Sequence, residues 1–158
     1  SEMCIRDRYY DYMIRYENLF FDPELQDVTM THTGWDNYEY QCTSHKVSSY
    51  GEAGKIWMIL REKDYRKCIY LLNLCGQSED YWNEGKEEPN IQKDIKFTVQ
   101  VDTPVEKICF STPDGKNMDA VELLFTERAT RTGKFIDFTV PSLNYWTTIW
   151  IDTRKETI

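Results

Sequence analysis

The chain has 158 residues, enough for one domain with its own core but too few for a typical catalytic barrel with an accessory domain. Hydrophobic residues make up 41% and charged residues 29%, which predicts a folded, globular domain. Acidic residues outnumber basic ones 27 to 19, and no apolar run approaches the roughly 20 residues that span a bilayer, so neither a nucleic-acid nor a membrane partner is predicted.

The amino-terminal segment divides into two parts. Residues 1–8 resemble a translated sequencing-adapter remnant of the kind found at broken ends of assembled metagenomic genes, and we expect them to be an artefact outside the fold. Residues 9–22 are predicted to be a short helix, because Tyr9, Met13, Tyr16 and Phe20 recur at helical spacing before the Asp22-Pro23 stop. Its apolar face could dock on the rest of the chain, but we expect it to face a missing upstream neighbour.

Residues 23–158 are predicted to form a single all-β domain. Short apolar runs alternate with turn residues, which is typical of an antiparallel sandwich. In Ile95 to Val101 every second residue is apolar, so this strand should have one buried and one wet face. The candidate strands are residues 27–32, 38–44, 55–63, 67–74, 91–101, 105–110, 121–126, 134–140 and 145–152.

Two of these runs are apolar at every position. They are Ile56 to Leu60 and Cys68 to Leu72, and they predict central strands whose second face is covered by another element or by a neighbouring domain. Outside residues 1–8 the cysteines show no C-x-x-C motif, so we expect buried free thiols rather than a zinc site or a disulfide framework. These cysteines are Cys42, Cys68, Cys75 and Cys109.

The residues themselves predict no catalytic, metal or cofactor site. The only histidines, His32 and His45, have no second ligand at metal-binding spacing, and no motif places a nucleophile beside a base. Carboxylates are plentiful in the loops, but sequence spacing cannot show two of them facing each other across a sugar, as glycosidases require. Most of them are expected to be solvated surface groups, including Asp36, Glu39, Glu79, Asp80, Glu84, Glu87 and Glu88.

A series of short motifs resembles the carboxyl-terminal part of glycoside hydrolase family 66, the dextranases and cycloisomaltooligosaccharide glucanotransferases. Residues 9–20 are similar to the helix that closes the catalytic barrel of this family. Four further pieces follow in family order: Leu71 to Leu74, Trp82, Ser111 to Asp114, and Phe138 to Trp146. Two departures, Thr112 inside the S-P-D piece and Thr147 where the family has Asp, indicate a distant member.

The resemblance implies an upstream (β/α)-barrel followed by a Greek-key β domain. That barrel would carry an Asp nucleophile and a Glu acid/base for retaining cleavage or transfer at α-1,6-glucan, in an extracellular or cell-envelope protein. No position here matches the catalytic pair, so the chain is expected to be a non-catalytic accessory domain whose partner is the missing barrel. Structural roles in strand-end hydrogen bonding and core packing are expected for Asn73, Pro141, Tyr145 and Trp146.

Two alternatives remain open. The chain could be a carbohydrate-binding module for α-glucan that stacks sugar rings on exposed aromatic side chains. The candidates for such a platform are Trp35, Tyr38, Tyr50, Tyr81 and Trp82. It could also be an independent small enzyme with facing carboxylates in the loops 36–39 and 79–88. Open, coplanar rings would favour binding, whereas buried rings would favour support.

Overall fold

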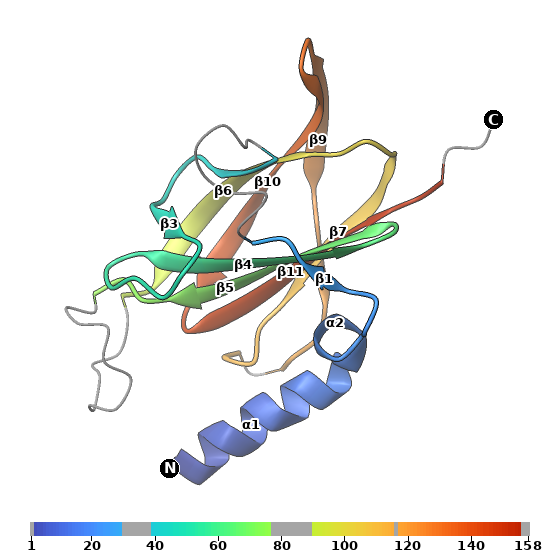
Figure 1. Ribbon diagram of the computed structural model, residues 1–158. Helices are drawn as coiled ribbons and strands as arrows, with labels where there is room; N and C mark the ends of the chain where they lie inside the picture. The colour runs from blue at the N-terminus through green and yellow to red at the C-terminus, as the bar shows by residue number, and fades with distance from the viewer. Residues whose placement is uncertain (1, 30–38, 77–89, 116, 156–158) are drawn as a thin grey trace.

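The computed structural model describes residues 2–29, 39–76, 90–115 and 117–155. Two helical segments precede two antiparallel sheets that stack as a sandwich (Figure 1). The all-β prediction with a preceding helix is thus confirmed. The elements are α1 Glu2–Arg15, α2 Glu17–Phe20, β1 Gln26–Asp27, β2 Tyr40–Cys42, β3 Val47–Ser48, β4 Ile56–Lys63, β5 Arg66–Asn73, β6 Gln92–Gln100, β7 Val105–Ser111, β8 Val121–Leu123, β9 Phe125–Thr130, β10 Gly133–Leu143 and β11 Trp146–Thr153.

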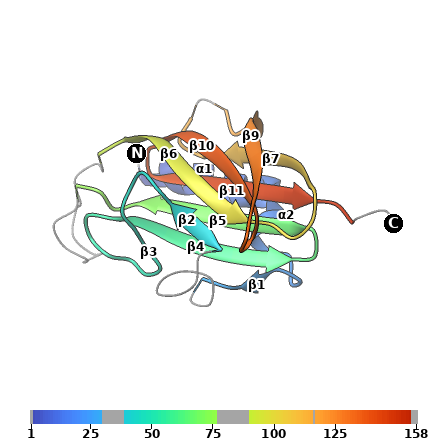
Figure 2. The same ribbon diagram turned by 90° about the horizontal axis from the view of Figure 1, so that it is seen from above.

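The chain crosses between the two layers several times, in the manner of a Greek key. The large sheet has the order β1-β4-β5-β11-β7-β8, with the short β3 lying parallel to β4, and the small sheet has the order β2-β6-β10-β9. Figure 2 shows the small sheet lying across the large one. The last strand, β11, sits between β5 and β7, so residues far apart in the sequence form the centre of the large sheet.

The main core lies between the sheets and follows the predicted periodicity. In β6, Ile95, Phe97 and Val99 point inward and are at most 1% exposed, while Lys96 is exposed. The inner face of the large sheet supplies branched aliphatic residues from β4, β5, β7 and β11 to the same cluster. Thr98, which points to the opposite face of β6, is also buried, and its hydroxyl donates to Asp137 Oδ1 on β10 at 2.5 Å.

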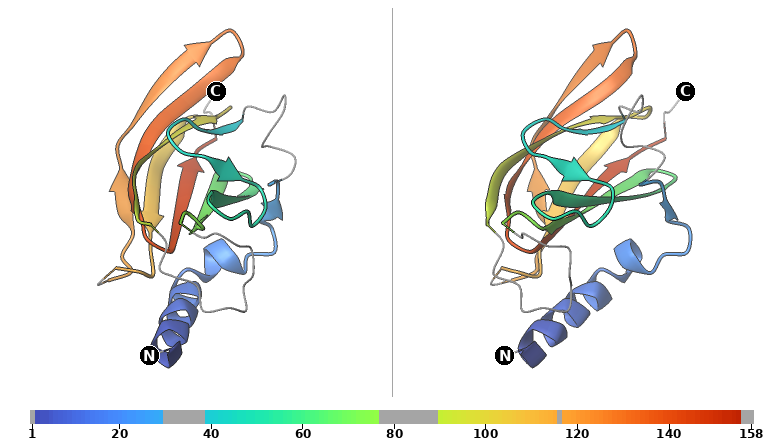
Figure 3. Two further views of the ribbon diagram at one scale, coloured as in Figure 1. Left: turned by 90° about the vertical axis from the view of Figure 1, so that its left-hand side faces the viewer. Right: turned by 60° about the vertical axis from the view of Figure 1, so that its left-hand side comes forward.

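The helix docks on the sandwich. The expectation that its apolar face packs on a missing neighbour was therefore wrong for the side of the helix that carries Tyr12, Tyr16 and Leu19. Tyr12 and Leu19 are 0% and 1% exposed against the outer face of the large sheet. The helix also begins at Glu2 instead of Tyr9, and it leaves helical geometry at Tyr16 (φ −110°, ψ 39°), which separates α1 from α2. Figure 3 shows both segments lying beneath the large sheet.

This docking explains the two runs that are apolar at every position. They form β4 and β5, whose inner faces line the main core, while Ile59, Cys68 and Tyr70 line a second cluster under the helix. Both predictions for these strands are confirmed. The four cysteines outside residues 1–8 are free, and Cys68 and Cys109 are buried, where desolvation raises the pKa of the Cys68 thiol to about 11.

The segment predicted as one strand over residues 121–126 is divided between the two sheets. β8 pairs with β7 in the large sheet, and β9 pairs with β10 in the small sheet. Leu124 lies at the crossing between them, is paired in neither sheet, and is 95% exposed. A run of apolar residues therefore does not mark a single strand here.

Candidate functional site

Several residues of the family-like motifs meet at one place, which we call the helix–sandwich joint: α1, α2 and the outer face of β4, β5, β11 and β7. Others, such as Leu71, Phe138 and Leu143, lie in the core between the sheets. Tyr12, from the first motif, packs against Trp146, from the last, with ring centroids 5.0 Å apart in an edge-on arrangement. Tyr12 also contacts Tyr16 at 5.1 Å and Phe20 at 5.7 Å. Such tilted and edge-on pairs add to the burial of the rings themselves.

Besides its ring contacts, Tyr12 makes buried hydrogen bonds at the centre of this joint. Its hydroxyl lies 2.6 Å from Ser111 Oγ and donates to the Ser111 carbonyl oxygen at 3.2 Å. Burial raises the pKa of Tyr12 to about 12, and the hydrogen bond with Ser111 limits that rise. Because Ser111 is 1% exposed, each hydroxyl satisfies a partner that water cannot reach.

Asp114 connects the helix to the turn between β10 and β11. Its carboxylate accepts hydrogen bonds from the backbone N–H groups of Tyr145 at 3.0 Å and Trp146 at 2.8 Å. The Tyr9 hydroxyl donates to the other carboxylate oxygen at 3.1 Å, and burial together with the Asp114 charge raises the pKa of Tyr9. The Thr112 hydroxyl donates to the Trp146 carbonyl at 2.6 Å, which completes a clamp around the turn.

Asn73 ends β5 and bonds three backbone segments. Its side-chain amide donates to the carbonyl oxygens of Asn90 and Asn144 at 2.8 Å each and of Leu143 at 3.3 Å, and its Oδ1 accepts from the Cys75 N–H at 2.9 Å. The structural roles predicted for Asn73 and Trp146 are confirmed. Core packing was wrong for the other two motif residues, since Pro141 is exposed and Tyr145 is 43% exposed.

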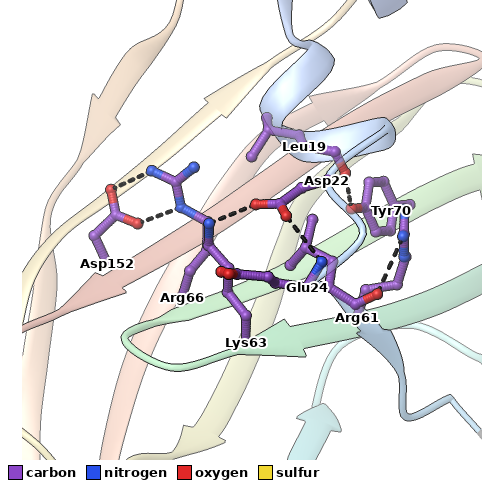
Figure 4. A network of polar contacts seen from close by, with 9 residues as sticks. Leu19, Asp22, Glu24, Arg61, Lys63, Arg66, Tyr70 and Asp152 are labelled. Atoms are coloured by element: carbon purple, nitrogen blue, oxygen red, sulfur yellow. Dashed lines mark hydrogen bonds and ion pairs between the residues drawn. The ribbon is translucent and has the colours of Figure 1, made fainter.

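A polar network fixes the segment that leaves the helix (Figure 4). Lys63 Nζ lies 2.5 Å from Asp22 Oδ2, and this hydrogen bond lowers the pKa of Asp22. Arg61 donates to the carbonyl oxygens of Phe20 at 3.1 Å and Leu25 at 3.3 Å, and the Tyr70 hydroxyl donates to that of Leu19. The sequence analysis missed this network, because ordinary surface-type residues gain their roles only through distant partners.

The predicted sugar-binding residues are mostly outside the described part of the chain. Trp35, Tyr38, Tyr81 and Trp82 fall there, as do most of the loop carboxylates at 36–39 and 79–88. Tyr50 is described and is 61% exposed. Among residues 2–29, 39–76, 90–115 and 117–155, no three His, Cys, Asp or Glu side chains gather as a metal site, and no helix there is long and apolar enough to cross a membrane.

Comparisons with known proteins agree with this arrangement. The chain matches the family description "Glycosyl hydrolase family 66" over residues 5–150. Two cycloisomaltooligosaccharide glucanotransferases of Niallia circulans are 29% and 25% identical to it over 145 residues, which is 90% of this chain and 14% of each relative. The chain therefore spans about one seventh of the length of these relatives.

A solved structure supports the fold. A cycloisomaltooligosaccharide glucanotransferase from Paenibacillus sp., complexed with cycloisomaltoheptaose, superposes with a TM-score of 0.77 at 21% identity, covering 90% of this chain and 20% of the other. At that identity the likeness concerns the fold alone. The family match covers most of the sequence, and the chain therefore belongs to glycosyl hydrolase family 66.

Proposed function

We propose that the chain is the carboxyl-terminal accessory β domain of a dextranase-like glycoside hydrolase that acts on α-1,6-glucan. In this proposal residues 9–22 belong to the last helix of a catalytic barrel, residues 23–158 support that barrel, and residues 1–8 are an adapter remnant. The catalytic carboxylates lie upstream in the same polypeptide, which is extracellular or in the cell envelope.

The observation that carries the proposal is the convergence of four residues, from three of the motifs, on the helix–sandwich joint. Tyr12, Ser111, Asp114 and Trp146 bond or pack with one another, and they hold a helix against a sheet. Two acidic residues of the helix motif, Asp11 and Glu17, are exposed on its surface. Residues used in this way fix one domain relative to another, which is what an accessory domain contributes to a catalytic one.

Exchange of the domain into a relative tests the proposal. The region of the Niallia circulans glucanotransferase that matches residues 5–150 is deleted in one variant and replaced by this chain in a second. We expect the deletion to abolish formation of cyclic products and the replacement to restore it. This chain alone should release no sugar from dextran. Sugar release by the isolated chain, or equal activity of the deletion and the replacement, would contradict the proposal.

A carbohydrate-binding module is the second candidate, and the exposed ring of Tyr50 favours it. Stacking of glucose units on aromatic rings needs such open faces. Electrophoresis through a dextran-containing gel checks this candidate directly. Retardation that is lost in Tyr50→Ala and kept in Tyr65→Ala, whose ring is 46% exposed, would favour binding over support.

A further inference from the structure

Helix α1 carries more apolar surface than its docking on the sandwich uses. Tyr12 and Tyr16 face the sheet, whereas Tyr10 and Ile14 are 66% and 49% exposed. At about 100° per residue, the apolar side chains from Tyr12 round to Ile14 cover roughly 200° of the helix circumference. A helix that packs on one partner needs an apolar stripe of only about 100°. Half of this apolar surface therefore has no partner in the described structure.

An apolar hollow lies between the helical segments and the sheet. It has a volume of about 450 Å³ and is lined by Tyr9 and Phe20 on the helix side and by Ile59, Leu72 and Trp146 on the sheet side. Arg61 also borders it, but its guanidinium donates to the carbonyl oxygens of Phe20 and Leu25. The hollow thus accepts apolar groups, and around the helix the apolar stripe continues from Tyr9, which lines the hollow, through Met13 to Tyr10.

We infer that Tyr9, Tyr10, Ile14 and this hollow form a docking surface for apolar side chains of the polypeptide that precedes residue 9. This inference rests on the proposed function, in which a barrel precedes the helix. The relatives are about seven times longer than the matched region, since this region is 14% of each. In that proposal the preceding polypeptide joins at Tyr9, within α1, whose amino end extends away from the sandwich (Figures 1 and 3).

The size of the surface favours this occupant over a second copy of the chain. The exposed parts of Tyr10 and Ile14, together with the hollow, offer a partner roughly a few hundred Å² of apolar surface. Stable interfaces between separate proteins bury about 800 Å² on each partner. A covalently attached segment needs far less, because its effective concentration is already in the millimolar range. A small apolar surface next to the point of attachment therefore suits a tethered neighbour.

The test compares two double variants with matched exposure. Tyr10→Gln/Ile14→Gln alters the docking surface, and Val121→Gln/Leu124→Gln alters residues that are 48% and 95% exposed in another part of the chain. Each pair is made in the isolated chain and in the chimera with the Niallia circulans protein. In the isolated chain we expect both pairs to leave the unfolding temperature within about 2 °C of the parent.

In the chimera we expect only the docking pair to lower the unfolding temperature of the β domain, by roughly 4 °C or more. An equal effect of the two pairs would overturn the inference. So would a loss of the same size in the isolated chain, or a concentration-dependent dimer of the isolated chain that the docking pair abolishes. If the chimera with the parent chain is active but its unfolding temperature does not change with the docking pair, only the docking surface is refuted. If that chimera is inactive and its β domain unfolds as the isolated chain does, the proposed function is refuted as well.

Discussion

Replacing Tyr12 by alanine should remove most of the stability that the helix–sandwich joint provides. The side chain is fully buried, and truncation of a buried aromatic residue costs about 3–5 kcal/mol, because contacts are lost and a cavity remains. Domains of this size are stable by about 5–15 kcal/mol. With an m-value near 2 kcal/mol/M, the urea midpoint should fall by roughly 1.5–2.5 M.

Tyr10→Ala is the matched control, because the neighbouring tyrosine is 66% exposed and should change stability by less than about 0.5 kcal/mol. Unfolding is followed by tryptophan fluorescence, to which Trp146 and Trp150 in the cluster under the helix contribute among the five tryptophans of the chain, and by far-ultraviolet circular dichroism, which reports on the strands. The two curves should coincide, since the second core is shared by helix and sheet. A loss below about 1.5 kcal/mol, or a fluorescence change at much lower urea than the change in strand signal, would refute the reasoning.

Three further outcomes follow from the same contacts. Tyr12→Phe and Ser111→Ala should each cost about 1–2 kcal/mol, because Tyr12→Phe leaves the buried Ser111 hydroxyl without this partner and Ser111→Ala leaves the Tyr12 hydroxyl only the Ser111 carbonyl oxygen. The double variant should cost less than their sum, and urea unfolding of the four proteins checks this cycle. Asn73→Ala should cost about 2–3 kcal/mol in the same assay, because the carbonyl oxygens of Leu143 and Asn144 lose this donor and the Cys75 N–H loses its acceptor. The pKa of Tyr12 is raised from 10.0 to about 12, so folding favours its neutral form, and the stability it contributes should be intact below pH 10 and lost as the pH rises toward 12. The free energy of unfolding of the parent, measured with urea at several pH values, should therefore fall over this range relative to that of Tyr12→Phe. Parallel pH profiles of the two proteins would contradict the assignment.

Local patterns were sufficient for the strands that have a clear period or a continuous apolar run. The alternation around Ile95 and the two-sided run around Ile69 predicted β6 and the central β5, because side-chain direction in a strand alternates with a fixed period of two. The motif residues Asn73 and Trp146 were also placed correctly in structural roles. These features depend on a few neighbouring residues, so sequence alone contains them.

The strand breaks were harder to predict, because they depend on pairing partners. Val121 to Thr126 reads as one strand, yet Leu124 marks the crossing from the large sheet to the small one. Pro141 lies inside β10 but has no paired residue on β6, where Asp94 adopts φ 53°. Proline has no N–H to donate to the ladder and is tolerated at such an irregularity. The neighbouring residues in the sequence do not predict this break in the pairing.

By itself, the sequence determined the all-β class, the helix that precedes it, the free cysteines and the family. Only the tertiary structure decided where the apolar face of the helix packs and what Asp114 does. The joint pairs Tyr12 with Ser111, 99 residues away, and Asp114 with Trp146, 32 residues away. Periodicity records which residues are buried, but it does not record against what, since contacts at such separations arise only when the strands have taken their order in the sheets.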